Sequence, residues 1–279
     1  MGYHEALDYA RRHDLEAMSI AVNGHVAFED FATGWNGDKS HALYSGTKSF
    51  WGVTAIAAVE DGLLVLDEPV ADTIAEWRAD PRKALMTVRH LLNLTSGYGF
   101  GGLGASVPVP EKAIATPLKN DPGTTFTYGG IPLQVFGEVL RRKLAPSKRS
   151  PHDYLRERIL DPIEVAIGSW RTLRDGTQPL PTGAFLCAEM WLAYGQYLLE
   201  RARAGDAFAE CTRGSQVNPR YGLGFWLDPL GASDGTFYAS GSGGQALYVI
   251  PSRNMVVAHF SKSSSWKHDA FLRRLLTNE

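Results

Sequence analysis

The residues of this chain best suited to chemistry are a serine and a lysine three positions apart, Ser45 and Lys48, directly before the apolar run 50–59. If residues 45–59 form one helix, both side chains lie on the same face, near the positive end of the helix dipole. Burial disfavours the ammonium form of the lysine and lowers its pKa, which leaves a neutral amine that can take the serine proton. The pair therefore predicts a nucleophilic serine that needs no histidine.

The same spacing occurs a second time, at Ser264 and Lys267, in a polar run near the C-terminus. We interpret this second pair as an accidental match on a solvated surface. Spacing alone is therefore weak evidence, and the case for Ser45 depends on the segments around it.

Strands are expected at both ends of the chain, with helices between them. Asn23-Gly24 separates two apolar runs, which is the strongest short signal for a β-hairpin. Residues 251–254 predict a turn, and residues 95–127, rich in Gly, Pro, Ser and Thr, predict a long loop. The expected strands are 18–22, 25–31, 221–227, 235–240, 245–250 and 255–260, and the expected helices are 5–14, 45–61, 87–94, 131–143, 152–160, 189–204 and 266–276.

This order of elements predicts an α+β fold. The simplest packing joins the two ends of the chain into one antiparallel sheet of about five strands, flanked by the N- and C-terminal helices, with a mostly helical lobe inserted. Residues 1–279 then form a single domain, with residues 1–40 and 215–279 in a sheet lobe and residues 41–214 in a helical lobe.

The bulk composition argues against several classes of function. The formal net charge of −2 offers no electrostatic case for nucleic acid or an anionic membrane. No Cys or His spacing is typical of a metal site; for the two cysteines, Cys187 and Cys211, we expect a reduced state and leave a disulfide open. No apolar run approaches the roughly 20 residues of a membrane span. The N-terminus shows no signal peptide, so the chain as given is expected to be cytoplasmic, or periplasmic or secreted if a signal has been removed.

Seven sequence blocks in a fixed order give the Ser45 pair its context. In order and spacing they resemble the serine β-lactamase-like superfamily, most closely its branch of class C β-lactamases, DD-peptidases and esterases. The resemblance extends over nearly the whole chain and rests on residues 45–50, 60–70, 87–97, 122–130, 134–140, 221–226 and 239–245.

The resemblance implies a role for each matching residue. Ser45 would be the acylated nucleophile and Lys48 its proton partner. Tyr128 would match the tyrosine of the family's Tyr-x-Asn motif, which shares the proton transfers and serves the leaving group. An unperturbed phenol titrates at about pH 10, so Tyr128 needs a cationic neighbour such as Lys48 to act as a base. The oxyanion hole would consist of the backbone N–H groups of Ser45 and Ser242.

Departures from the family pattern concern substrate recognition. Ala239 replaces the cation of the third motif, and its methyl group cannot bind a substrate carboxylate. Gly130 replaces the asparagine of the second motif, which removes an amide-recognising side chain. Gly130, Ser240 and Gly241 are the positions expected to meet the substrate; a strand-edge role for Ser240, and close backbone approach or a bulge at Gly241, are the alternatives. Asn93, in place of the usual histidine, is interpreted as structural.

Three aromatic residues, Tyr98, Phe100 and Trp226, are candidates for the pocket wall, with a core position as the alternative for each. None of the eight histidines has an Asp or Glu at a sequence spacing that would indicate a catalytic pair. We therefore assign no role to any of them.

Together these residues favour a serine hydrolase that forms a covalent acyl-enzyme on a small ester or amide, without a metal or organic cofactor. The lost recognition groups favour an esterase-like or small-amide hydrolase over an efficient β-lactamase. Two alternatives stay open: a DD-peptidase or β-lactamase, hence a penicillin-binding protein, whose cation comes from elsewhere in the chain, and a non-catalytic binding protein that kept the fold. The partner is expected to be a small-molecule substrate, and the oligomeric state stays open.

Overall fold

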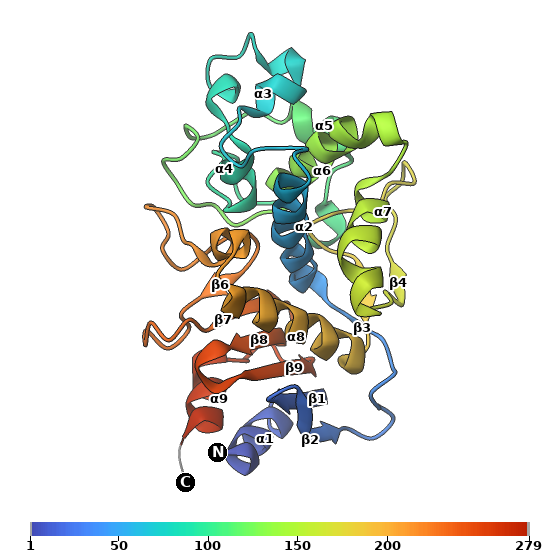
Figure 1. Cartoon of the computed structure of the whole chain (residues 1–279), viewed down its shortest axis with the longest axis vertical. Helices are drawn as coiled ribbons and strands as arrows, with labels where there is room; N and C mark the ends of the chain where they lie inside the picture. Colours follow the sequence, from blue (N-terminus) through green and yellow to red (C-terminus); the bar gives the residue numbers. More distant parts are fainter. Residues whose placement is uncertain (1, 278–279) are drawn as a thin grey trace.

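A six-stranded sheet built from both ends of the chain is the main element of the computed structural model, which describes residues 2–277 (Figure 1). The strand order is β2-β1-β9-β8-β7-β6, and every neighbouring pair is antiparallel. The predicted α+β architecture is confirmed, with six strands where about five were expected. The strands are β1 (Leu15–Val22), β2 (His25–Phe31), β6 (Trp226–Leu227), β7 (Phe237–Gly241), β8 (Gln245–Ile250) and β9 (Met255–Ser261).

The two predicted turns of this sheet form because their residues tolerate left-handed backbone angles. Asn23 and Gly24, between β1 and β2, have φ of +54° and +81°, as a two-residue hairpin turn requires. Asn254, with φ of +48°, closes the turn between β8 and β9. The hairpin predicted at Asn23-Gly24 and the turn predicted at residues 251–254 are both confirmed.

Helices cover both faces of the sheet. α8 lies on one face, against β9, β8 and β1, while α1 and α9 lie side by side on the other (Figure 1). Among the described residues, none of the helices has the length and apolar character to cross a membrane. The helices are α1 (Tyr3–Arg11), α2 (Ser49–Glu60), α3 (Val70–Thr73), α4 (Val88–Leu92), α5 (Pro110–Ala115), α6 (Ile131–Leu144), α7 (Pro151–Leu155), α8 (Ala188–Ala204) and α9 (His268–Leu276).

Side-chain alternation in the strands supplies both faces with apolar groups. In β8, Leu247 and Val249 belong to the cluster shared with α8, whereas Tyr248 and Ile250 belong to the cluster under α1 and α9. A strand covered by helices on both faces is apolar at nearly every position, and all six residues of β8 are buried.

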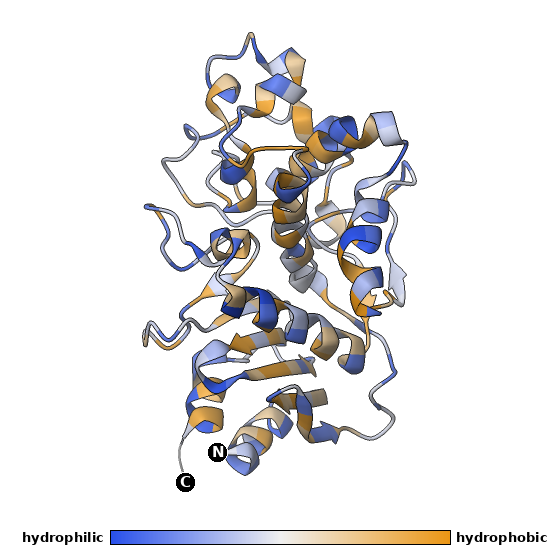
Figure 2. Ribbon diagram, in the orientation of Figure 1, coloured by the Kyte–Doolittle hydropathy of each residue, from blue (hydrophilic) through white to orange (hydrophobic). Residues whose placement is uncertain are grey.

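The helical lobe is organised around α2. Its ten residues 49–58 are all buried, and Figure 2 shows it as largely apolar along its length, as expected for a helix that is covered on every side. Its N-terminus points toward the sheet (Figure 1). The turn η1 (Tyr44–Lys48), which precedes α2, therefore lies against β7 and β8 of the sheet.

Some predicted elements were wrong. Of the predicted strand 221–227, only Trp226–Leu227 forms β6. The segment 95–127 contains a short helix, α5, which is six residues long and too short to show helical periodicity in the sequence. A second sheet, of order β3-β5-β4, was not predicted because its strands span two or three residues. They are β3 (His41–Ala42), β4 (Ser169–Trp170) and β5 (Ala184–Leu186).

Candidate active site

Ser45 lies in η1 (Tyr44–Lys48), a 3-10 helical turn that runs directly into α2. Tyr44, just before the serine, has a left-handed φ of +47°, a backbone conformation that is costly for residues with a Cβ and that concentrates at functional sites. The turn brings Lys48 next to Ser45, and Lys48 Nζ donates a hydrogen bond to Ser45 Oγ at 2.9 Å. The contact expected from the spacing is present.

Lys48 is enclosed, with only 1% of its surface exposed. Its Nζ also donates to the backbone carbonyl of Pro181 at 3.0 Å. Burial lowers the pKa of Lys48 to about 7, because the low-dielectric surroundings disfavour the ammonium form. When the amine is neutral, its lone pair can accept the Ser45 proton along the 2.9 Å contact while one N–H stays on Pro181. The position of Lys48 and its lowered pKa are those that a general base would need.

Tyr128 lies next to this pair, two residues before the N-cap of α6. Its hydroxyl is hydrogen-bonded to the Ser45 side chain, and Lys48 Nζ lies 4.9 Å from its ring centre. Burial raises the pKa of Tyr128, and the hydrogen bond to Ser45 offsets this only in part. The phenol therefore keeps its proton at neutral pH, so Tyr128 can donate a proton while Lys48 accepts one.

The strand β7 brings a second backbone donor to the same place. A Cβ on Gly241 would lie 2.2 Å from the carbonyl oxygen of Leu43, so β7 approaches the start of η1 too closely for any side chain at this position. Among residues 2–277, the backbone N–H groups of Ser45 and Ser242 donate to no backbone carbonyl. Two free N–H donors beside a nucleophile are what an oxyanion hole requires.

These residues share a pocket of about 450 Å³. Of the residues proposed from the sequence, Ser45, Tyr128, Ser240, Gly241 and Ser242 line it together. The complete lining consists of Ser45, Leu103, Tyr128, Trp226, Tyr238, Ser240, Gly241, Ser242 and His268.

Of the three residues proposed to bind the substrate, Gly130 is the one that does not line the pocket. It is buried, and a Cβ there would lie 1.8 Å from the carbonyl oxygen of Gly102. Close approach of two backbone segments, rather than contact with a substrate, explains a glycine at this position. We therefore correct the substrate-binding assignment of Gly130.

The aromatic candidates separate into three environments. Trp226 lines the pocket and stacks on Tyr128, with ring centres 5.7 Å apart. Tyr98 is a core residue that is 1% exposed, and Phe100 is 77% exposed. Asn93 is buried, and its side-chain oxygen accepts a hydrogen bond from the Thr95 hydroxyl at 2.6 Å, which agrees with a structural role.

Sequence reasoning missed His268, the first residue of α9, which meets β7 in the pocket. Trp266 Nε1 donates to the Tyr248 hydroxyl at 3.1 Å, and the Tyr248 hydroxyl lies 2.7 Å from His268 Nδ1. Because an indole N–H can only donate, the Tyr248 hydrogen is left for Nδ1, and the neutral imidazole carries its proton on Nε2. His268 Nε2 then donates to Ser240 Oγ at 3.1 Å, which leaves the Ser240 hydrogen for a substrate acceptor.

Burial lowers the pKa of His268 to about 4, so this imidazole is neutral at physiological pH. No pattern in the sequence links His268 to Ser240, since the contact depends on how α9 packs on the sheet.

Within the described residues, no group of three His, Cys, Asp or Glu side chains could hold a metal ion. Cys187 and Cys211 are both free thiols. Every group assigned a chemical role above is a side chain or backbone amide of this chain.

The fold of this chain has counterparts among solved structures. A D-stereospecific amidohydrolase from a Streptomyces species superposes with a TM-score of 0.77 at 16% identity, covering 100% of this chain and 99% of that one. A putative beta-lactamase from Bacteroides dorei superposes with a TM-score of 0.79 at 18% identity, covering 96% of this chain and 95% of that one. At these identities the likeness concerns the fold.

A curated relative, the acyltransferase calJ of Penicillium decumbens, is 29% identical over 115 residues, a match that covers 30% of this chain and only 27% of the relative. The sequence model of the Beta-lactamase family matches residues 12–279, nearly the whole chain. This protein therefore belongs to the Beta-lactamase family.

Proposed function

We propose that this protein is a serine hydrolase that cleaves a small ester or amide through a covalent acyl-enzyme. The observation that carries the proposal is the 2.9 Å contact between Ser45 Oγ and Lys48 Nζ, with the amine buried and its pKa lowered to about 7. A neutral amine at this distance can activate the serine at physiological pH.

The groups around Ser45 account for each step of such a reaction. Lys48 takes the Ser45 proton as Oγ attacks the substrate carbonyl, and the resulting oxyanion is held by the N–H groups of Ser45 and Ser242. When the carbonyl re-forms, the bond to the leaving group breaks, and Tyr128 donates a proton to that group. The Lys48 ammonium then returns its proton to the Tyr128 phenolate, so that both groups regain their starting states. Water gives a proton to the neutral Lys48 as it attacks the acyl-enzyme. When the acyl–Oγ bond breaks, Lys48 passes that proton to Oγ, which releases the acid and restores Ser45.

The pocket wall favours a substrate that carries few polar groups and no charge. Leu103, Trp226 and Tyr238 supply apolar and aromatic surface, and Ser240 supplies one directed hydrogen-bond donor. Ala239, at the position of the family's cation, is 1% exposed and offers no charge. This composition supports a small ester or uncharged amide over a β-lactam.

Covalent labelling tests the proposal, because the chain supplies its own control. Ser45→Ala should abolish hydrolysis of short-chain nitrophenyl esters and labelling by a fluorophosphonate probe. Ser264→Ala, in the second Ser-x-x-Lys sequence, removes an exposed serine and should leave both unchanged. Labelling that persists in Ser45→Ala, or that disappears in Ser264→Ala, would refute the assignment.

The alternative of a binding protein on the same fold predicts that the lysine and the serine are separated and that Tyr128 is turned away. The 2.9 Å contact and the hydrogen bond between Tyr128 and Ser45 argue against that alternative.

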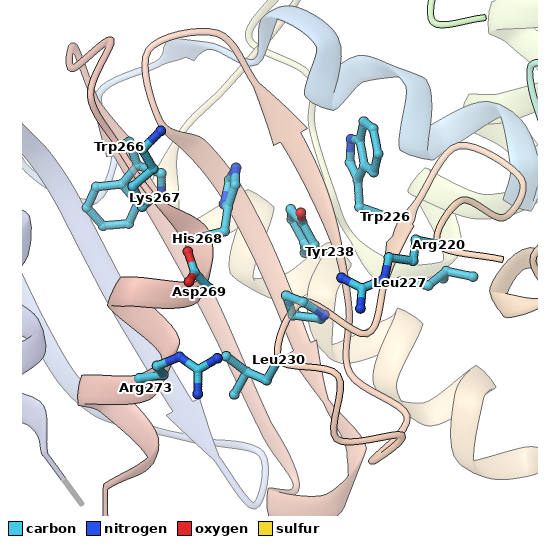
Figure 3. Close-up of a pocket in the computed structure, with 11 residues that line it drawn as sticks. Arg220, Trp226, Leu227, Leu230, Tyr238, Trp266, Lys267, His268, Asp269 and Arg273 are labelled. Carbon is cyan, nitrogen blue, oxygen red and sulfur yellow. The ribbon is translucent and has the colours of Figure 1, made fainter. Parts of the chain in front are cut away.

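A specific observation favours a second enzyme class, a DD-peptidase or β-lactamase whose cation comes from elsewhere. Beside the catalytic pocket lies a second hollow of about 570 Å³, which shares Trp226, Tyr238 and His268 with it. Figure 3 shows the guanidinium groups of Arg220 and Arg273 pointing toward the middle of this hollow from opposite sides. Neither arginine side chain is paired with an acid in the described part of the chain.

Parallel assays separate the two classes. A chromogenic cephalosporin and a short-chain nitrophenyl ester are compared in the wild type, Arg220→Gln and Arg273→Gln. Efficient ester cleavage at the same rate in the wild type and in both variants supports the esterase. Efficient cephalosporin turnover that is lost in either variant, with negligible ester cleavage, supports the second class.

A further inference from the structure

The turn between β7 and β8, residues 242–244, is held by an unusual set of contacts. Its three successive carbonyl groups each accept a hydrogen bond from a buried side chain. The Gln245 amide Nε2 donates to Ser242 O at 3.2 Å, the Ser261 hydroxyl donates to Gly243 O at 2.7 Å, and His259 Nδ1 donates to Gly244 O at 2.8 Å. We call these three donors, Gln245, His259 and Ser261, the turn clamp.

All three donors are inaccessible to solvent. Gln245 is 2% exposed, and His259 and Ser261 are fully buried. The Gln245 amide also donates to the backbone carbonyl of Ser261 in β9, which ties the turn to the neighbouring strand. Burying polar groups without hydrogen bonds is costly, and the donor atom of each of these three side chains is hydrogen-bonded to the same turn. The three contacts therefore restrain the turn together.

The turn needs such a restraint because its two glycines can adopt many backbone conformations. Gly243 and Gly244 have left-handed φ values of +83° and +91°, a region that glycine enters without penalty and leaves as easily. Two consecutive glycines directly after Ser242 would allow the preceding peptide group to reorient. The clamp removes that freedom at each of the three carbonyls.

The peptide group that matters most is the one between Gly241 and Ser242, which carries the Ser242 N–H. On one side Gly241 is paired with Gln245 in the β7–β8 ladder, and on the other side Gln245 holds the Ser242 carbonyl. A peptide group between two fixed neighbours has little rotational freedom. These contacts fix the orientation of the Ser242 N–H, and Ser242 lines the pocket together with Ser45.

We propose that Gln245 is a positioning residue for the oxyanion hole, acting through Ser242, with Ser261 and His259 restraining the rest of the turn. This inference rests on the proposed acyl-enzyme function. Preorganised donors stabilise a transition state because they need not reorient when charge develops on the substrate oxygen. Gln245 therefore acts on the rate of acylation rather than on the binding of the substrate.

The test compares Gln245→Leu and Gln245→Glu with the wild type on a short-chain nitrophenyl ester. Gln245→Leu removes both donated hydrogen bonds and should lower kcat about 10- to 100-fold with KM within about twofold, because only the transition state carries the oxyanion. Amide hydrogen exchange in residues 241–244 should become faster.

Gln245→Glu gives a readout that a purely structural role would not produce. A protonated carboxyl group can donate one hydrogen bond to a carbonyl, whereas a carboxylate can donate none. Because both proteins need the neutral Lys48, the activity of Gln245→Glu is measured relative to the wild type at each pH. This relative activity should fall as pH rises and the carboxyl ionises. A parallel rise in both proteins would overturn the proposal.

A matched control removes a buried hydrogen bond elsewhere. Tyr154→Phe deletes a 2.7 Å contact to Asp61 in the helical lobe and should change stability without changing kcat. If Gln245→Leu does not fold, Ser261→Ala, which removes a single donor to Gly243, should lower kcat in the same direction. An unchanged kcat in a folded Gln245→Leu or Ser261→Ala, or a change in KM alone, would refute the positioning role. Absence of Ser45-dependent turnover in the wild type would instead refute the proposed function itself.

Discussion

Lys48 Nζ lies 2.9 Å from Ser45 Oγ, inside a turn where both side chains point the same way. The same nitrogen donates to the carbonyl of Pro181, 133 positions further along the chain. The first contact follows from local helical geometry, and the second from the packing of the helical lobe. Together they hold a buried amine in one orientation, with its reactive side toward the nucleophile.

The lowered pKa of Lys48 sets the expected pH profile. The value of kcat/KM for a neutral ester should rise between pH 5 and 8 with an inflection near pH 7, because the free enzyme needs the neutral amine. It should then stay level, since burial raises the pKa of Tyr128. Stopped-flow or plate-reader assays across this range measure the profile. A flat profile would exclude Lys48 as the base, and Lys48→Arg, whose guanidinium stays charged, should be inactive throughout.

Burial of Lys48 also costs stability, with a definite dependence on pH. Its pKa is about 7 in the folded protein and 10.5 unperturbed, so the unfolded chain binds more protons between these values. Wild-type stability therefore rises with pH over this window. Lys48→Met lacks the penalty, and its stability relative to the wild type should be greatest at pH 6 and decline by up to about 1.4 kcal/mol per pH unit above pH 7.

Urea unfolding of both proteins at pH 6, 7, 8 and 9 measures this difference, and groups common to both proteins cancel. A difference that stays constant over the series would show that Lys48 is not the titrating group.

Tyr128→Phe tests proton donation to the leaving group. The substitution keeps the ring that stacks on Trp226 and removes only the hydroxyl. Loss of a general acid costs about 10²- to 10⁴-fold. We expect this loss with an ester of an alkyl alcohol, which must be protonated as it leaves, and a much smaller loss with a nitrophenyl ester, whose leaving group departs as a stable anion. Equal losses with both esters would contradict the assigned role.

Gly241→Ala tests the close approach of β7 to the nucleophile. The new Cβ would lie 2.2 Å from the Leu43 carbonyl, so strand and turn must separate and carry the Ser242 N–H away from Ser45. We expect kcat/KM to fall at least about 100-fold, as when an oxyanion donor is lost. Gly37→Ala is the control, because its Cβ would make only an ordinary 3.8 Å contact with Phe31 and activity should be retained. Near-normal activity in Gly241→Ala would show that the spacing is not critical.

Elements of the fold that depend on a short continuous stretch of sequence could be predicted. The β1–β2 hairpin follows from Asn23-Gly24, and the buried helix α2 follows from a run of apolar residues. Short elements could not be predicted: α5 and the two-residue strands β3 and β4 show no period, and β6 is much shorter than its apolar run. The strands β3 and β4 exist because both hydrogen-bond to β5, and for β3 this partner lies in a distant part of the chain.

The sequence by itself paired Ser45 with Lys48, because a spacing of three residues in a helical turn brings the two side chains together. The sequence blocks around them distinguished this pair from Ser264 and Lys267. The sequence also determined the order of the blocks that place the chain in the Beta-lactamase family. The tertiary structure alone decided that Lys48 is buried, that Gly130 packs against Gly102 away from the pocket, and that His268 directs the Ser240 hydroxyl. Local geometry depends on residue spacing, whereas burial, pKa and contacts between strands and helices depend on which distant segments pack together.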